Sequence, residues 1–200
     1  MTQKLKNKLN NDLKELLKFF LGFISWIMFL FLAGDTLPSL ERAIIICLFV
    51  SLIFGYKQLR DGFILQWGTV LFFALCAILV NLLHIVVIAK SMGIIANGFL
   101  AAIIWITILT GKPFTLQYAR ADLPRERWND PYLVQSCQFI AIFWGALLTF
   151  STLVSCFRLL KPDAYPGWVY SAISISTIIG GSVFTQLYKK YKRKLSRRPT

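Results

Sequence analysis

Long runs of apolar residues, separated by short polar connections, dominate the sequence. A helix of about 20 mostly apolar residues is long enough to cross the hydrocarbon core of a bilayer. Six runs meet or approach this length, and they cover residues 19–34, 40–56, 63–88, 92–110, 132–157 and 167–188. The boundary between the third and fourth runs is the least marked, because only residues 90–93 interrupt it. The pattern predicts an all-α fold, an integral membrane bundle of about six transmembrane helices within residues 19–188.

Two basic segments flank the predicted bundle, at residues 1–18 and 189–200. In the first, leucines recur near helical spacing with lysines between them, which predicts an amphipathic interfacial helix with its lysines facing anionic head groups. An unstructured basic tail is the alternative. A cleaved signal peptide is disfavoured, because residues 1–18 are long for its charged region and no clear cleavage site follows. The second segment is expected to be a basic cytoplasmic tail.

The composition supports a membrane protein. The chain is 56% hydrophobic and 16% charged, whereas soluble domains have about 45–50% apolar and about 25% charged residues. A net charge of +13 would suit nucleic acid. The basic residues, however, lie between and beyond the apolar runs and form no continuous face. The expected partner is therefore the phospholipid bilayer, and no nucleic acid is expected.

The distribution of basic residues predicts the orientation in the membrane, since Lys and Arg concentrate in cytoplasmic connections. With the N-terminus inside, the inner segments hold 18 of the 22 Lys and Arg residues, and the outer ones hold 4. An odd number of helices would mix these two groups. Both termini are therefore predicted to be cytoplasmic.

No catalytic, cofactor-binding or metal-binding residues are assigned. The four cysteines are isolated and the chain has a single histidine, so zinc-ligand spacing is absent from the sequence. Phosphate-loop, HExxH and GxSxG motifs are also absent from it, and an enzyme is not expected. All nine acids fall at helix ends or in connections, which disfavours a cation-coupled carrier. A passive small-solute or lipid transporter or channel stays the alternative to a binding protein.

Three polar residues in the predicted third and fourth helices form a candidate intramembrane cluster. Asn81 and His84 are three residues apart and share a helix face, near the outer interface. Asn97 is a candidate interhelical partner for them. A hydrogen-bonded interfacial pair is the favoured interpretation, and a proton relay is the alternative.

Small residues recur at helical spacing in the last two predicted helices. One ridge is Ala141, Gly145 and Thr149, and the other is Ala172, Ser176 and Gly180, with Gly181 beside it. Such ridges let helix backbones approach closely within a membrane. They predict packing of the two helices, with a homo-oligomer face as the alternative.

The polar stretch at residues 111–131, called the inner connector below, is the main candidate for function. Pro113 is expected to end the preceding helix, residues 115–121 to form a short surface helix, and Asp130-Pro131 to start the next span. The arginines are expected to pair with Asp122 and Glu126 or with lipid phosphates. An ordered connector without a ligand is the alternative. The candidate partner-binding or lipid-binding residues are Lys112, Phe114, Tyr118, Arg120, Arg125, Arg127 and Trp128.

Residues 100–190 resemble the intracellular septation protein A family of bacterial inner-membrane proteins. The resemblance is carried by Lys112-Pro113, Leu123-Pro124 with Trp128, Trp144, Pro166 and Trp168-Val169. A related multi-pass membrane family carrying the Pro-Phe-Thr loop would fit the same residues. The resemblance implies a non-enzymatic inner-membrane protein that acts in cell-envelope organisation or division by binding envelope or division membrane proteins.

Overall fold

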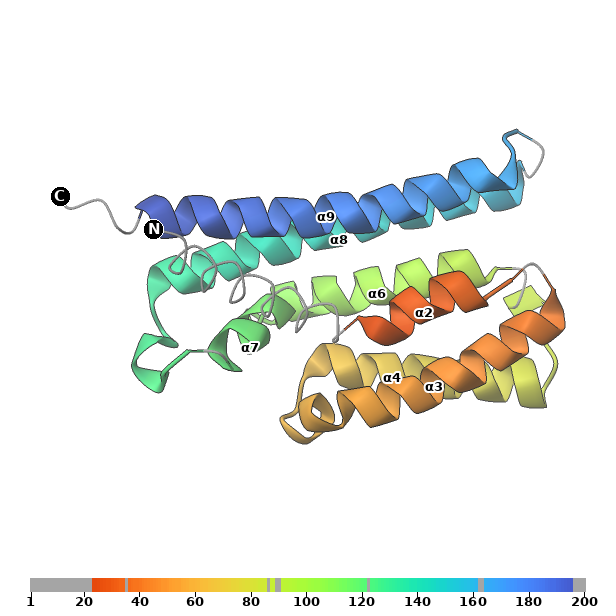
Figure 1. Ribbon diagram of the computed structural model, residues 1–200, viewed down its shortest axis with the longest axis horizontal. Helices are drawn as coiled ribbons and strands as arrows, with labels where there is room; N and C mark the ends of the chain where they lie inside the picture. The colour runs from red at the N-terminus through yellow and green to blue at the C-terminus, as the bar shows by residue number, and fades with distance from the viewer. Residues whose placement is uncertain are drawn as a thin grey trace, which may run out of the picture. The chain divides into compact units, whose positions relative to one another are not determined.

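The computed structural model describes residues 23–34, 36–85, 87–88, 91–121, 123–161 and 164–195. These residues form helices joined by turns, which confirms the all-α class (Figure 1). The chain divides into two compact units, Met1–Lys90 and Ser91–Thr200. The predicted amphipathic segment 1–18 lies outside the described residues.

Five helices are long and apolar enough to cross a membrane: Leu37–Arg60, Ile64–Leu82, Met92–Leu109, Pro131–Leu160 and Gly167–Lys192. They correspond to the second to sixth predicted spans. Of the first predicted span, the structure describes α2 (Ile24–Leu32), which is nine residues long. The chain is therefore an α-helical protein compatible with multiple membrane crossings, five of them within the described residues.

In the first unit, α3 (Leu37–Arg60) and α4 (Ile64–Cys76) form a tight hairpin. Gly62 takes a positive φ of 74° after the last turn of α3. Its N–H donates to Leu59 O, and that of Phe63 donates to Gln58 O. These two hydrogen bonds together form a Schellman motif, which satisfies the last carbonyls of a helix and reverses the chain.

An aromatic cluster packs α2 against α4. The indole Nε1 of Trp26 donates to Thr69 Oγ1 at 2.9 Å, and both residues are buried. The Trp26 ring lies 4.8 Å from Phe72 and 5.3 Å from Phe73, centroid to centroid, and Phe29 meets Phe73 edge-on. Large aromatic side chains bury much apolar surface, so this cluster contributes to the packing of α2 on α4.

The predicted third span does not run as one α-helix to residue 88. After Cys76 the chain continues as a π-helix, η1 (Ala77–Leu82). The N–H of Ile85 then donates to Leu79 O, and His84 adopts a positive φ of 49°. Turns of π-helix are rare and recur at functional sites. Here the wider turn changes the direction of the side chains at the end of the span.

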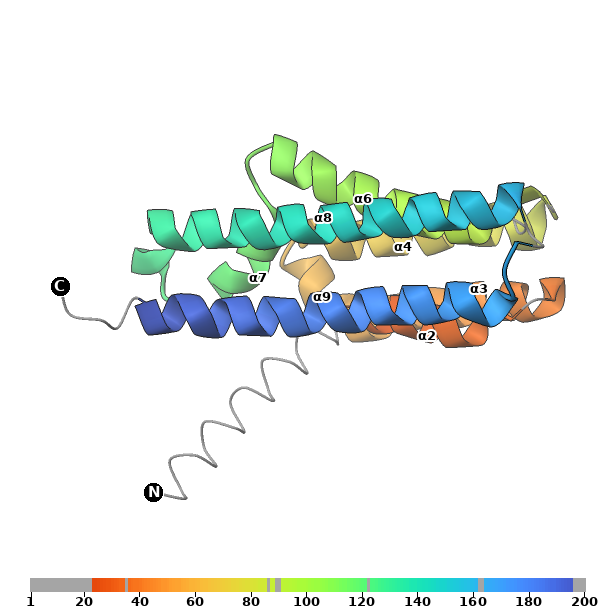
Figure 2. The same cartoon turned by 90° about the horizontal axis from the view of Figure 1, so that it is seen from above.

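In the second unit, α8 (Pro131–Leu160) packs against α6 (Met92–Leu109) and α9 (Gly167–Leu195), and α8 and α9 run side by side (Figures 1 and 2). The Trp105 ring packs against Gly145 of α8, where an added Cβ atom would lie 3.1 Å from the nearest ring atom. Gly181 of α9 similarly receives Trp144. Helix α9 continues to Leu195, so the first part of the predicted tail 189–200 is helical.

The two small-residue ridges have different roles. Ala141 and Gly145 are buried, and Thr149 accepts a hydrogen bond from Trp105 Nε1 at 3.1 Å, so the first ridge packs against α6 rather than α9. The second ridge is exposed along its length, and a Cβ on Gly180 would meet open space. The predicted packing of the two helices is confirmed, but the close α8–α9 contact is made at Gly181, beside the second ridge, rather than by the two ridges themselves.

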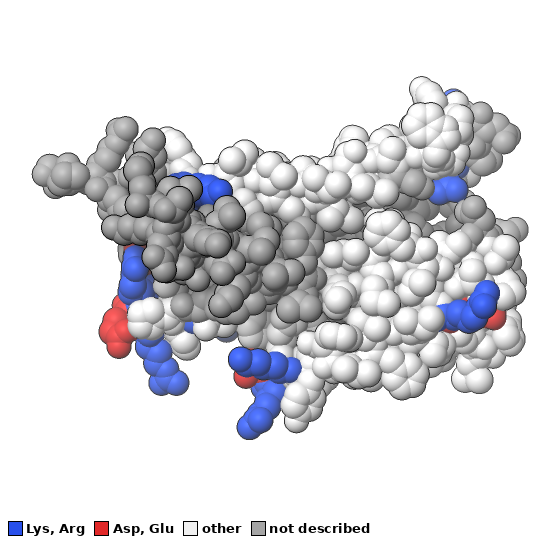
Figure 3. Space-filling view, in the orientation of Figure 1, with Lys and Arg blue, Asp and Glu red and all other residues white. Residues whose placement is uncertain are grey.

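Large apolar side chains are exposed over most of the helical surface, among them Phe31, Ile53, Leu82 and Leu109 at 68–83%. Soluble proteins rarely expose contiguous apolar areas of such extent. Figure 3 shows charged side chains near the helix ends and an uncharged surface between them. Lipid is the solvent that fits this surface.

Candidate functional site

The inner connector begins with a second Schellman motif, which ends α6. Gly111 has a φ of 70°, its N–H donates to Ile108 O, and that of Lys112 donates to Thr107 O. The helix ends at Leu109, one residue before the predicted end of the span at residue 110, because Gly111 takes the left-handed conformation that this cap requires. The predicted short helix is present as α7 (Phe114–Ala121).

Helix α7 is fastened to both neighbouring spans. The N–H of Phe114 donates to the buried Thr107 Oγ1 of α6 at 3.2 Å, and Thr115 Oγ1 donates to Cys137 O of α8 at 2.6 Å. Phe114 is fully buried, at 0% exposure, and its ring meets Tyr118 edge-on. Burial also raises the pKa of Tyr118 above its ordinary value. Phe114 therefore packs the connector in place and does not contribute to its exposed surface.

The second half of the connector folds around Trp128. The guanidinium of Arg120 donates to Trp128 O through Nε at 3.3 Å and Nη2 at 3.2 Å, and to Asn129 Oδ1 at 3.3 Å. The Trp128 indole donates to Leu123 O at 3.0 Å. The guanidinium carbons of Arg120 and Arg125 lie 5.8 and 5.7 Å from the Trp128 ring, within the range of cation–π attraction.

The connector ends at a helix cap that the sequence predicts. Asp130 accepts a hydrogen bond from the Tyr132 N–H at 3.0 Å, and Pro131 occupies the first turn of α8. Between α7 and this cap, Arg125 and Arg127 are exposed on the 3-10 turn η2 (Arg125–Arg127). Lys112 is exposed at the other end. Asp122, an expected partner of the arginines, lies outside the described residues.

Of the seven predicted connector residues, the structure thus leaves three cations accessible. Lys112, Arg125 and Arg127 are exposed, Arg120 and Trp128 hold the fold of the connector, and Phe114 and Tyr118 pack α7. Trp128 keeps an intermediate exposure. The connector thus exposes three cations, whose charge suits phosphate or carboxylate groups.

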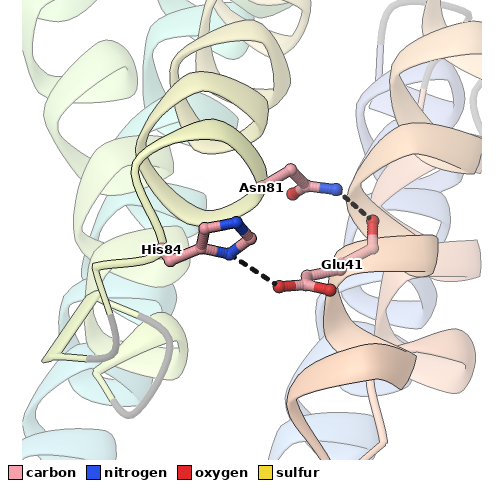
Figure 4. Close-up of polar contacts among 3 residues, drawn as sticks. All are labelled: Glu41, Asn81 and His84. Carbon is pink, nitrogen blue, oxygen red and sulfur yellow. Dashed lines mark hydrogen bonds and ion pairs between the residues drawn. The ribbon is translucent and has the colours of Figure 1, made fainter.

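The predicted polar cluster is built in the first unit around a residue that the sequence analysis missed, Glu41. The Asn81 amide donates to the backbone O of Glu41 at 3.0 Å, and His84 Nδ1 lies 3.5 Å from Glu41 Oε1 (Figure 4). One signal in the sequence could have indicated this contact. Glu41 and Asn81 lie at similar distances in sequence from Gly62, where the α3–α4 hairpin turns. Asn81 and His84 therefore face one neighbouring helix, α3.

A shallow pocket of about 330 Å³ opens at this place. Its lining residues, called the Glu41 pocket below, are Glu41, Arg42, Ile45, Ile46 and Asn81. The Oδ1 atom of Asn81 is buried and has no hydrogen-bond partner in the structure. A buried acceptor of this kind carries a desolvation cost unless a donor reaches it.

Asn97 has partners of its own in the second unit. Its amide donates to Gly93 O at 3.0 Å and approaches Ser155 Oγ at 3.4 Å. This amide therefore links α6 and α8 within the second unit. Among the described residues, no three His, Cys, Asp or Glu side chains are grouped to hold a metal ion.

Comparison with known proteins adds no relative. No family model, no curated protein and no solved structure matches the chain. The geometry of the inner connector and of the Glu41 pocket therefore carries the functional argument.

Proposed function

We propose that this chain is a multi-pass bacterial inner-membrane protein with six spanning helices and both termini in the cytoplasm. It acts without catalysis in cell-envelope organisation or division, by binding membrane partners or lipid through the inner connector. The resemblance to the intracellular septation protein A family favours the same role.

The single observation that carries the proposal is the construction of the connector. A passive link between two spans needs few fixed contacts, whereas this one is tied to α6 by Phe114, to α8 by Thr115 and to itself by Arg120. The contacts present Arg125 and Arg127 on a fixed turn. Preorganised cations lose less conformational entropy on binding, which favours a recognition surface.

The transporter alternative requires the polar residues of the spans to share a water-accessible path. In the first unit, Gln66 donates to Ser51 O whereas Asn81 donates to Glu41 O, ten residues and about 15 Å away along α3. In the second unit, the Asn97 amide donates to Ser155 Oγ of α8, whereas Gln138 is exposed more than four turns earlier on the same helix. These separate partners favour binding over transport.

Site-specific photocrosslinking in cells tests the proposal. A photoreactive residue at Arg127 is expected to give discrete crosslinks to membrane proteins or to anionic lipid. The matched control is Asp61, which is exposed at the other predicted inner connection. The crosslinks at Arg127 should disappear in an Arg120→Gln background, because the turn loses its anchor. Identical products from both positions would overturn the proposal.

A further inference from the structure

The Glu41 pocket lies at the end of its hairpin opposite the basic turn of α3. Eighteen residues separate Arg42 from Arg60 in this helix, which is about 27 Å along its axis. The hydrocarbon core of a bilayer is about 30 Å thick. A helix that places Arg60 at one head-group layer therefore places Arg42 and the pocket at the other.

The pocket combines groups of opposite charge with a buried acceptor. Arg42 lines it, and its Nε donates to Pro38 O at 3.1 Å. The two terminal amino groups of a guanidinium held in this way suit bidentate contact with a phosphate. The Glu41 carboxylate, whose side chain is 26% exposed, and the Asn81 Oδ1 atom instead require donors.

Apolar side chains continue from the pocket along α3. Ile45 and Ile46 line the pocket, and Phe49 and Ile53 follow at helical spacing. The exposed fraction rises along this row, from 36% at Ile45 to 68% at Ile53. This stripe leads from the charged groups toward the middle of the span. An acyl chain lying against it would be joined to a head group in the pocket.

The end of the neighbouring span is shaped to hold this arrangement. The π-helix η1 carries Asn81 to α3, and the positive φ of His84 places its imidazole beside Glu41 (Figure 4). A non-glycine residue in this conformation is strained and persists where surrounding contacts require it. The strain thus fixes one side of the pocket.

We propose that the Glu41 pocket binds the head group of a phospholipid that carries both a phosphate and a primary ammonium, as phosphatidylethanolamine does. The ammonium donates to the Glu41 carboxylate and to Asn81 Oδ1, and Arg42 binds the phosphate. The site lies at the opposite end of the predicted span from the inner side, so it goes beyond the connector and does not rest on it.

Native mass spectrometry of the full chain, released from detergent with defined lipids, tests this site. Phosphatidylethanolamine is expected to be retained about tenfold better than phosphatidylcholine, whose ammonium has no N–H donor, since one charge-assisted hydrogen bond is worth about that factor. The mono-methylated and dimethylated lipids should fall between them. Equal retention across this series would overturn the proposal, and this wild-type comparison requires no variant to fold.

Three variants separate the roles of the two charged groups. Glu41→Gln is expected to lower the retention of phosphatidylethanolamine to that of phosphatidylcholine. Arg42→Gln should lower both lipids together, and the control Lys161→Gln, at another predicted outer connection, should change neither. An unchanged preference in Glu41→Gln would contradict the assignment. Displacement of the lipid by equimolar free glycerophosphoethanolamine would show that the apolar stripe contributes nothing and would overturn the lipid as the ligand.

Discussion

The side-chain amide of Gln66 lies in the space that a Cβ atom on Gly55 would occupy. The amide Nε2 donates to Ser51 O at 2.8 Å, and Gln66 is 3% exposed. A glycine in the middle of α3 thus admits a polar side chain of α4 to a backbone carbonyl. Within a membrane, this bond satisfies an amide that has no water to bind.

Substituting Gly55 with Ala should destabilise the first unit. The added methyl group overlaps the Gln66 amide, and overpacking of a well-filled core costs about 1–3 kcal/mol. The measurement is thermal unfolding of the purified chain in detergent. Gly180→Ala is the matched control, since a Cβ there meets open space, and it should unfold at or slightly above the wild-type temperature because alanine favours the helix. Equal effects of the two substitutions would contradict the packing described for Gly55.

The interhelical bond from Trp144 Nε1 to Thr185 Oγ1, 3.1 Å long, should stabilise the α8–α9 pair. Trp144→Phe removes the donor and keeps an aromatic ring, so a loss of about 0.6–1.7 kcal/mol is expected. A double-mutant cycle with Thr185→Val measures the coupling between the two side chains. A coupling energy of zero would show that the bond adds nothing to helix association.

Arg120→Gln should loosen the inner connector without unfolding the spans. The substitution removes the paired donors to Trp128 O and one of the two cations near the Trp128 ring. Amide hydrogen exchange should become faster over residues 123–129 and stay unchanged in α6. Arg125→Gln is the control, because Arg125 approaches the same ring and its substitution keeps the Arg120 bonds to the backbone. Similar exchange in both variants would contradict the anchoring role of Arg120.

Alkaline pH should weaken the docking of α7. Burial raises the pKa of Tyr118 in the folded chain above its ordinary value. The neutral phenol therefore contributes stability that is fully present below about pH 10, the pKa of an unfolded tyrosine. That stability is lost as the pH rises further, toward the folded pKa. Tyr118→Phe should flatten the fall in unfolding temperature between about pH 9 and 11, and Tyr132→Phe, at a 77% exposed site, should not.

The parts of the fold that the sequence predicts are those with local causes. The start of α6 at Met92 follows from the polar interruption before it, and the start of α8 follows from the cap formed by Asp130 and Pro131. The short helix α7 follows from its isolation between Pro113 and Leu123-Pro124. In each case the residues that decide the boundary lie within a few positions of it.

The candidate sites depend on contacts between residues far apart in the chain, so periodicity alone could not locate them. The π-helix at Ala77–Leu82 lies in an apolar run without Gly or Pro, and no local residue marks it. Glu41 approaches Asn81 only because the α3–α4 hairpin closes at Gly62. The burial of Phe114 similarly depends on Thr107 and Cys137, in two different spans.

The central claim is that the inner connector faces the cytoplasm and that the connection after α8 faces the opposite side. Single-cysteine labelling of the intact chain in whole cells, in a background without native cysteines, tests it directly. A membrane-impermeant maleimide should label Lys161→Cys in intact cells and label Glu126→Cys only after the membrane is permeabilised. Labelling of Glu126→Cys in intact cells, or protection of Lys161→Cys, would contradict the topology on which the proposed role of the inner connector depends.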